Sequence, residues 1–399
     1  MLRRLLPPIA VLLVPFALVF GIWAGGHPEV LPGFMRDTLV DDSDGQVYEE
    51  AVDIIARDYF RDVDRDRLLD ASIQAAVGEL RKRFEDPFSH YFDPKAYRRF
   101  HEATSGEFEG IGMTVQDHPR GLKVLTVFED GPAERAGLER DDVITEANGT
   151  SLRGKTSEQS TALIKGPAGT KVRLTVRSGK RRRSITVERA SISVPVVDSR
   201  MERKGGHRIA YASLASFTSG AHGELARALR PLLRRDADGV VLDLRNNGGG
   251  LLQEGVLVAS LFVSDGVIVT TRGRSRPSKS YKASGQAVDT EIPLVVLVNQ
   301  DTASASEIVA GALKDRDRAT VVGTRTYGKG VFQEVQPLPN GGALDITVGE
   351  YFTPKGRNLA PADGKPGGIP PDVRAQDDAD TRPDEALQRA LSVLAGKIE

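Results

Sequence analysis

The chain has 399 residues, 40% of them hydrophobic and 27% charged, which is ordinary for a globular protein with room for two or three domains. Its 54 lysines and arginines are balanced by 55 acidic residues, so the net charge gives no indication of nucleic-acid or membrane binding. Cysteine is absent, which excludes disulfides, thiol catalysis and cysteine metal sites.

Residues 1–26 have the features of a targeting segment. Arg3 and Arg4 precede an uncharged apolar run, residues 5–23, that would extend about 28 Å as a helix, just enough to span a bilayer. Small residues at its end offer a cleavage site. The segment is therefore a signal peptide or an uncleaved membrane anchor. The two arginines predict that the rest of the chain lies outside the cytoplasm, in the cell envelope or secreted.

A linker and a helical region follow this segment. Residues 27–44 contain proline, glycine and clustered aspartates, a composition typical of a linker. Helical periodicity then runs from Gln46 to about Phe100, interrupted at residues 86–91 by Asp-Pro-Phe-Ser-His-Tyr. We expect residues 45–106 to form a structural or dimer-forming helical domain.

Residues 107–192 have the pattern of a small unit of short strands. Residues 122–128 and 171–176 alternate between polar and apolar, and a turn-rich segment, residues 131–138, lies between them. Successive backbone amides near the start of this unit could bind a peptide's terminal carboxylate while the peptide adds to a sheet edge. The residues concerned are Gly110, Ile111, Gly112 and Met113. Alone, a Gly-x-Gly pair more often marks a turn.

The same region contains a match to a phosphate-binding loop. Residues 149–156 satisfy Gly-x4-Gly-Lys-Thr, and the run from Val240 to Asp243 could supply a magnesium-binding strand. An ATPase is thus a competing hypothesis. Its context argues against it, because residues 143–147 are too polar for a central parallel strand. We expect Lys155 to be a solvent-exposed side chain beside a turn.

From residue 193 to residue 375, strands alternate with helices, which predicts an α/β core. The strand at 239–244 ends in Arg-Asn-Asn-Gly-Gly-Gly, and a helix is expected at 251–262. A glycine turn before a helix offers amides to an anion, although three glycines can also simply make a tight turn. Residues 376–399 are expected to end the chain with an amphipathic helix.

A serine stands where a predicted buried strand gives way to a predicted helix. The valine-rich run at 293–298 has the composition of a buried strand, and residues 305–314 have apolar side chains at helical spacing. At this junction Ser304 could attack a carbonyl while free helix-start amides hold the developing negative oxygen. The alternative is a helix cap, since Ser304 and Glu307 form the capping-box pattern Ser-x-x-Glu.

Such a serine needs a base, and none of the six histidines lies near it in the sequence. A Gly-x-Ser-x-Gly elbow is also absent. A lysine can act as the base if burial keeps it neutral. Lys329 is the candidate, because flanking glycines allow close packing, and Gln333 would share its strand face and could hold its amine. The alternative is a turn lysine that points to solvent.

These motifs resemble those of the carboxy-terminal processing, or tail-specific, serine proteases. The resemblance rests on Ser-Ala-Ser-Glu-Ile at 304–308, Tyr-Gly-Lys-Gly at 327–330 and the glutamine at position 333. The unit at 107–192 resembles a protease-associated PDZ domain, with its carboxylate-binding loop at Gly110–Met113. The resemblance extends over residues 45–375.

The resemblance implies a role for each motif residue. Ser304 would be the nucleophile, Lys329 the general base and Gln333 the residue that orients the lysine, with Ser306 as the second choice of nucleophile. The Asp-Leu-Arg-x-Asn-x-Gly-Gly phrase at 243–250 is similar to the family's oxyanion-hole segment. The implied hole consists of backbone amides, those of Gly249 or preferably Gly250, and of Ala305.

The implied fold is multidomain α/β and α+β: a ClpP/crotonase-like α/β protease core with an N-terminal helical region and a PDZ domain. The expected function is that of an extracytoplasmic serine endopeptidase that cleaves proteins near exposed C-termini, which the PDZ domain recognises. The alternative is a catalytically inert PDZ scaffold that binds peptides. We expect no cofactor, no metal and no nucleic-acid partner. The resemblance alone implies a homo-oligomer.

Overall fold

The computed structural model of the chain divides into two compact units, Met1–Tyr91 and Phe92–Glu399, and each is described here by itself. The predicted targeting segment, residues 1–26, lies outside the described residues. Within the described part of the chain, no helix has the length and apolar character needed to cross a membrane. The described residues are 43–361, 366–377 and 383–398.

The first unit is built on two helices, α3 (Ser43–Asp58) and α4 (Arg65–Phe84). The carboxylate of Asp64 caps α4 by accepting hydrogen bonds from two amides of its first turn. Val52 and Val77 are buried. Other apolar residues of α3, Val47, Ile54 and Ile55, are exposed within this unit.

The second unit begins with α5 (Pro94–Ser105) and continues into an antiparallel sheet of order β3-β4-β5-β7-β8. Its strands are β3 (Met113–His118), β4 (Gly121–Val127), β5 (Val143–Ala147), β7 (Lys171–Ser178) and β8 (Arg181–Glu188). Accessory elements are β6 (Thr150–Ser151), which pairs with β5, the helices α6 (Pro132–Arg135) and α7 (Ser157–Ile164), and the pair β2 (Glu107–Gly110) and β9 (Ala190–Ser193).

This sheet rules out the phosphate-loop interpretation of residues 149–156. The preceding strand β5 pairs antiparallel with both β4 and β7, whereas a phosphate loop follows a parallel strand. Gly149 lies in the turn between β5 and β6, with a φ of 81°. The glycine is therefore required by a hairpin turn.

The core of the second unit is a sheet of order β10-β11-β12-β15-β16-β19, in which only β10 runs antiparallel to its neighbour. Its central strands consist entirely of buried residues, as expected for parallel strands covered on both faces. The strands are β10 (Val197–Lys204), β11 (His207–Leu214), β12 (Gly239–Asp243), β15 (Leu294–Val298), β16 (Thr320–Gly323) and β19 (Val373–Arg374).

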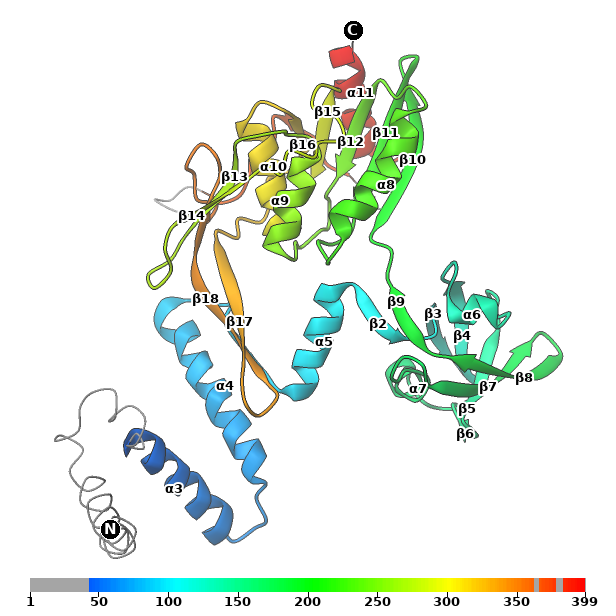
Figure 1. The fold of residues 1–399 in the computed structure, drawn as a ribbon, viewed down its shortest axis with the longest axis vertical. Coiled ribbons are helices and arrows are strands. Elements are labelled where there is room, and N and C mark those ends of the chain that lie inside the picture. Colours follow the sequence, from blue (N-terminus) through cyan, green and yellow to red (C-terminus); the bar gives the residue numbers. More distant parts are fainter. Residues whose placement is uncertain (1–42, 362–365, 378–382, 399) are drawn as a thin grey trace, which may run out of the picture. The chain divides into compact units, whose positions relative to one another are not determined.

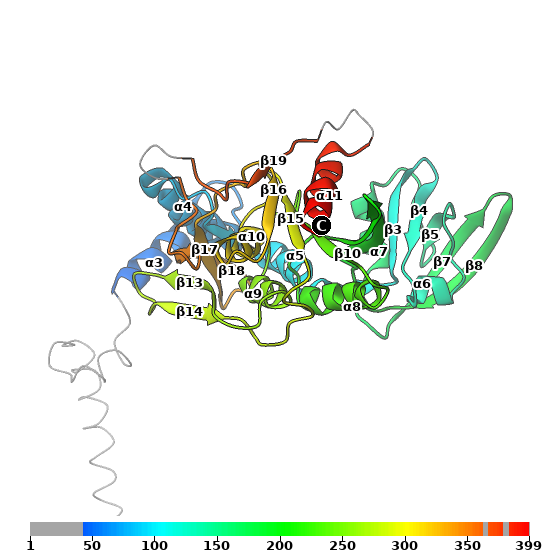
Figure 2. The same ribbon diagram turned by 90° about the horizontal axis from the view of Figure 1, so that it is seen from above.

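Helices cover both faces of this sheet (Figures 1 and 2). One face packs against α8 (Ala221–Leu233), α9 (Leu252–Ser260) and α10 (Ala305–Asp315), and the other against α11 (Glu385–Ile398). Alternation along β12 explains this, because Val240 belongs to the first apolar cluster and Val241 to the second. The α/β core predicted from the sequence is confirmed.

The chain also forms a second, antiparallel sheet, whose strands come before and after α10 in the sequence. It contains β13 (Val267–Arg272), β14 (Lys279–Lys282), β17 (Val331–Pro337) and β18 (Ala343–Phe352). The predicted strand at 331–335 is thus present as β17. Its pairing with β18 places Gln333 opposite Thr347, and this register matters for the site.

Candidate active site

The motif residues of the core lie on loops that follow β12, β15 and β16. These strands are parallel, so their carboxyl ends lie at the same edge of the sheet, where open α/β sheets usually bind ligands. The first two loops are joined by their asparagines. The Asn246 amide donates to Asn299 Oδ1 (2.9 Å), and Asn299 Nδ2 donates to Asn246 Oδ1 (2.7 Å).

Ser304 occupies the turn between β15 and α10 in a strained conformation. Its φ of 56° and ψ of −118° differ from the extended conformation that a helix-capping residue normally adopts. A non-glycine residue with positive φ is uncommon and is held in place only by its surroundings. Ser304 is also the N-cap of α10, in a capping box with Glu307. The two sequence interpretations, cap and nucleophile, are therefore compatible.

The Glu307 carboxylate joins the serine segment to the lysine segment. It is fully buried and accepts four hydrogen bonds. Oε2 accepts from the backbone amides of Ser304 and Lys329, each at 2.9 Å. Oε1 accepts from the Gly328 amide (2.8 Å) and from the Thr326 hydroxyl (2.6 Å). Because one oxygen accepts from both amides, the backbones of the serine and the lysine lie close together.

Burial raises the pKa of the Glu307 carboxyl above its usual value, although the four hydrogen bonds act in the opposite direction. The carboxylate therefore accepts hydrogen bonds in a desolvated position. Burial also raises the pKa of Tyr351 well above its usual value, and the charge of Glu307 adds to this effect. Tyr351 therefore remains a neutral phenol.

Lys329 is positioned through its side chain as well as its amide. Its Nζ donates to Gln333 Oε1 at 2.6 Å, and Gln333 Nε2 donates to Thr347 Oγ1 at 3.0 Å. The second bond orients the glutamine amide so that its oxygen faces the lysine. At Gly330, an added Cβ would lie only 2.3 Å from Asn358 Oδ1. The glycine beside Lys329 thus allows the close packing that the sequence predicted.

The glycine-rich loop after β12 packs directly against the serine. A Cβ at Gly249 would lie 2.8 Å from Ser304 Cβ and 2.9 Å from the Ala305 nitrogen, and the φ of Gly249 is 102°. Only glycine fits here. The Gly249 amide already donates to Asn247 Oδ1 (2.9 Å). Between the two predicted glycine amides, this geometry favours Gly250 as the oxyanion donor.

Ser306, the second candidate nucleophile, has a different position. It is fully buried, and its hydroxyl donates to the Asn247 carbonyl at 2.8 Å. The same carbonyl accepts from the Ala303 amide at 3.0 Å. Ser306 therefore holds the glycine-rich loop against α10.

Arg245, at the start of this loop, is held by two carboxylates. Its Nη2 lies 2.7 Å from Asp243 Oδ2 and 2.7 Å from Asp384 Oδ2, and Nη1 donates to Asp384 Oδ1 at 2.9 Å. Burial alone would lower the pKa of the guanidinium, but the two carboxylates raise it. Burial, together with the neighbouring Asp243, also raises the pKa of Tyr211 to about 12. Arg245 thus ties the loop to α11.

The predicted carboxylate-binding residues line a groove of about 330 Å³ in the strand-rich region. The groove runs beside β3, which is an edge strand of its sheet. Lys165 lies at one side, 3.0 Å from Glu102 and 5.0 Å from the ring centre of Phe108. The residues of the predicted loop that line the groove are Gly110, Ile111, Gly112 and Met113.

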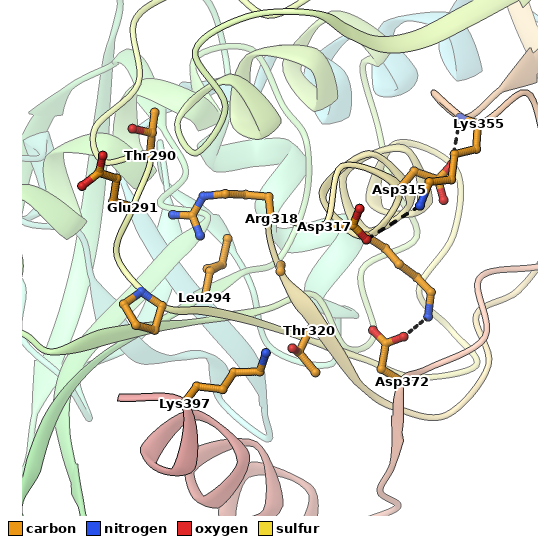
Figure 3. Close-up of a pocket in the computed structure, with 13 residues that line it drawn as sticks. Thr290, Glu291, Leu294, Asp315, Asp317, Arg318, Thr320, Lys355, Asp372 and Lys397 are labelled. Carbon is orange, nitrogen blue, oxygen red and sulfur yellow. Dashed lines mark hydrogen bonds and ion pairs between the residues drawn. The ribbon is translucent and has the colours of Figure 1, made fainter. Parts of the chain in front are cut away.

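A cavity of about 700 Å³ lies elsewhere on the core, where β15 and β16 begin (Figure 3). Its charged side chains largely neutralise one another, through the pairs Lys314–Asp372 and Lys355–Asp317. None of the motif residues lines it. Although this cavity is large, it is therefore not the candidate active site.

Sequence reasoning missed the roles of Glu307 and Asp384. The sequence pattern assigns Glu307 only to the capping box, but it also offers a signal, because Glu307 is an acidic residue directly before the apolar run 308–313 of α10. Such a residue has to find buried donors. Asp384 gave no local signal, since its partner Arg245 is distant in the sequence.

The raised pKa of Glu307 predicts a pH-dependent stability. Because the folded state binds this proton more readily than the unfolded state, the free energy of unfolding should fall as pH rises from about 4.3 through the raised pKa. Glu307→Gln, which carries no charge at any pH, should remove this contribution. Urea denaturation midpoints of both proteins across pH 4 to 7 test it, and parallel pH profiles would contradict it.

Known proteins similar to this chain support the family assignment that the sequence motifs indicate. Residues 208–375 match peptidase family S41, and residues 123–178 match a PDZ domain. A carboxyl-terminal-processing protease from Picosynechococcus is 41% identical over 283 residues, which cover 70% of this chain and 68% of that protein. A carboxyl-terminal-processing protease from Synechocystis is 36% identical over 333 residues, 81% of this chain and 77% of that protein.

Among solved structures, a photosystem II D1 C-terminal processing protease aligns with a TM-score of 0.49 and 30% identity, over 89% of this chain and 98% of that one. The family assignment rests on the sequence relatives. The resemblance read from the motifs is confirmed. The chain belongs to peptidase family S41, as a carboxyl-terminal-processing serine protease that carries a PDZ domain.

Proposed function

We propose that this protease cleaves peptide bonds with a dyad of Ser304 and Lys329, in which Gln333 orients the lysine. The observation that carries the proposal is the shared acceptor, Glu307 Oε2, which binds the backbone amides of both dyad residues. The Lys329 side chain is in turn held by Gln333. The geometry thus fixes both residues by backbone and side-chain contacts together.

In the proposed mechanism, Ser304 Oγ attacks the carbonyl carbon of the substrate while the neutral Lys329 Nζ takes the hydroxyl proton. The bond to the leaving amine then breaks, and the lysine gives that proton to the amine nitrogen. A water molecule then gives one proton to the same lysine and attacks the acyl carbon. The bond to Ser304 Oγ breaks, and Oγ takes the proton back from the lysine. Gln333 Oε1 accepts a hydrogen bond from Nζ throughout and so keeps the amine directed.

The proposed oxyanion hole consists of the backbone amides of Gly250 and Ala305. Ala305 is the first residue of α10, so its amide lies at the helix end that favours negative charge. Gly249 supports this hole by its close contact with Ser304. Preorganised amides of this kind typically contribute on the order of 10²–10³ in rate each.

The PDZ groove is proposed to select substrates by their free C-terminus. The loop from Gly110 to Met113 offers backbone amides to a carboxylate, and β3 offers an unpaired edge to which a peptide can add as a strand. The protease would then cleave proteins near exposed C-termini.

Location and assembly are proposed from the remaining sequence features. Residues 1–26 have the composition of a signal peptide or membrane anchor, so we place the protease outside the cytoplasm, in the cell envelope. A homo-oligomer is proposed through the first unit, which exposes apolar side chains at Val47, Ile54 and Phe84.

The dyad predicts which substitutions remove activity. With a loosely folded test protein that ends in apolar residues, Ser304→Ala and Lys329→Ala should each lose at least about a thousandfold in kcat/KM. Ser306→Ala is the matched control, and we expect it to stay within about tenfold of the wild type, because its hydroxyl makes one structural hydrogen bond. Cleavage by all four proteins at equal rates would refute the dyad.

The groove predicts a dependence on the substrate's terminal charge. A fluorescent peptide with a free C-terminal carboxylate should bind the Ser304→Ala protein at least about tenfold more tightly than the same peptide with a C-terminal amide, because charge-assisted hydrogen bonds are lost. Fluorescence anisotropy measures both affinities. Equal affinities would show that the groove does not read the terminus.

A further inference from the structure

Few large apolar side chains of the second unit are exposed, and two of them belong to the loops of the active site. Among the described residues of this unit, Val194 and Leu251 are each 37% exposed and Tyr327 is 58% exposed. Leu251 directly follows the proposed oxyanion donor Gly250, and Tyr327 precedes the proposed base Lys329 by two residues. One exposed apolar side chain therefore lies on the glycine-rich loop after β12, and another lies on the loop that carries Lys329.

The backbone of Leu251 is fixed next to the nucleophile. Gly249, two residues earlier, touches Ser304 so closely that no side chain would fit between them. The Leu251 amide donates to the Phe217 carbonyl at 2.9 Å, and the residue caps the start of α9. Leu251 is therefore held rigidly on the oxyanion side of Ser304 while its side chain meets solvent.

The backbone of Tyr327 is fixed to the segment that leads into the nucleophile. Its amide donates to the carbonyl of Thr302, two residues before Ser304, at 3.0 Å. Its neighbours Thr326 and Gly328 are buried and both donate to Glu307. The exposed Tyr327 ring thus lies on a backbone that is anchored on both sides of it.

Covering such side chains is favourable by about 25 cal/mol for each Å² of apolar surface removed from water. Because both loops contact the serine segment, a polypeptide chain whose carbonyl reaches Ser304 would approach both of them. Apolar side chains of that chain would cover Leu251 and Tyr327, whereas polar ones would lose hydration there without gaining a partner.

We propose that Leu251 and Tyr327 determine which residues flank the cleaved bond, and that both select apolar side chains. Leu251 contacts the residue that supplies the carbonyl, because that carbonyl oxygen binds the neighbouring Gly250 amide. Tyr327 contacts the residue that supplies the leaving amine, because Lys329 delivers the proton to that nitrogen. This inference rests on the proposed dyad and adds its substrate preference.

The test uses two pairs of peptides with free C-termini. The first pair differs only in leucine or asparagine on the carbonyl side of the cleaved bond, and the second pair carries the same change on the amine side. Mass spectrometry gives kcat/KM for each peptide. The wild type should prefer leucine in both pairs. Leu251→Ala should reduce the preference in the first pair by about fivefold, and Tyr327→Ala that in the second pair, each leaving the other pair unchanged.

Val194→Ala is the matched control, because Val194 is as exposed as Leu251 but lies between β9 and β10. It should leave both preferences at the wild-type value. Leu251→Met and Tyr327→Phe should retain them too, since they keep an apolar surface of similar size. Each peptide ratio is an internal comparison, so partial misfolding of a variant does not alter it.

If the wild type cleaves through Ser304 but Leu251→Ala and Tyr327→Ala keep both preferences, this inference is overturned and the proposed dyad stands. A loss of either leucine preference in Val194→Ala as large as that in Leu251→Ala or Tyr327→Ala would also overturn it. Cleavage that persists unchanged in Ser304→Ala would instead overturn the proposed function, and the inference with it. The outcomes therefore separate the two proposals.

Discussion

One buried carboxylate organises the catalytic edge of this protein. Glu307 receives the amide of the serine at the start of α10, two amides of the lysine loop and the hydroxyl of Thr326. Burying a charge without a cationic partner is costly, and the donors offset this cost only while all of them point at the carboxylate. The requirement works in both directions. The carboxylate depends on the hydrogen-bond donors of both loops, and the positions of the two loops depend on the carboxylate.

The glycines of the site follow from the same constraint. Once Ser304 is held in its strained turn, the neighbouring loop has to approach it closely, and only a residue without a side chain fits at position 249. The lysine loop likewise approaches Asn358 so closely that glycine is required at position 330. Backbone contacts thus determine the positions of the two residues of the proposed dyad, whose side chains are added to a frame that is already fixed.

The sequence was sufficient for the elements whose signals are local. The valine-rich strand before Ser304, the helix after it and the strand that carries Gln333 all lie where periodicity predicted them, to within a few residues. The motifs also led to the right family.

The interactions that join distant segments could not be predicted from local sequence patterns. The pairing of Arg245 with Asp384, the pairing of Gln333 with Thr347 and the acceptance of lysine-loop amides by Glu307 each depend on how separate elements pack in space. Solvent exposure was a further gap, since helical periodicity does not reveal that apolar residues of α3 such as Ile54 are exposed in their own unit.

The ion pairs that hold Arg245 have a consequence for biosynthesis. Asp384 lies 139 residues after Arg245 in the chain, yet it holds the start of the glycine-rich loop, and the helix that follows it covers one face of the core sheet. A growing chain in which Asp384 and α11 have not yet left the ribosome lacks both the ion pair between Arg245 and Asp384 and the helix that covers this face of the sheet. The glycine-rich loop can therefore be held in this way only after Asp384 and α11 have been made, so the proposed oxyanion donors reach their final positions later than the core strands that carry them.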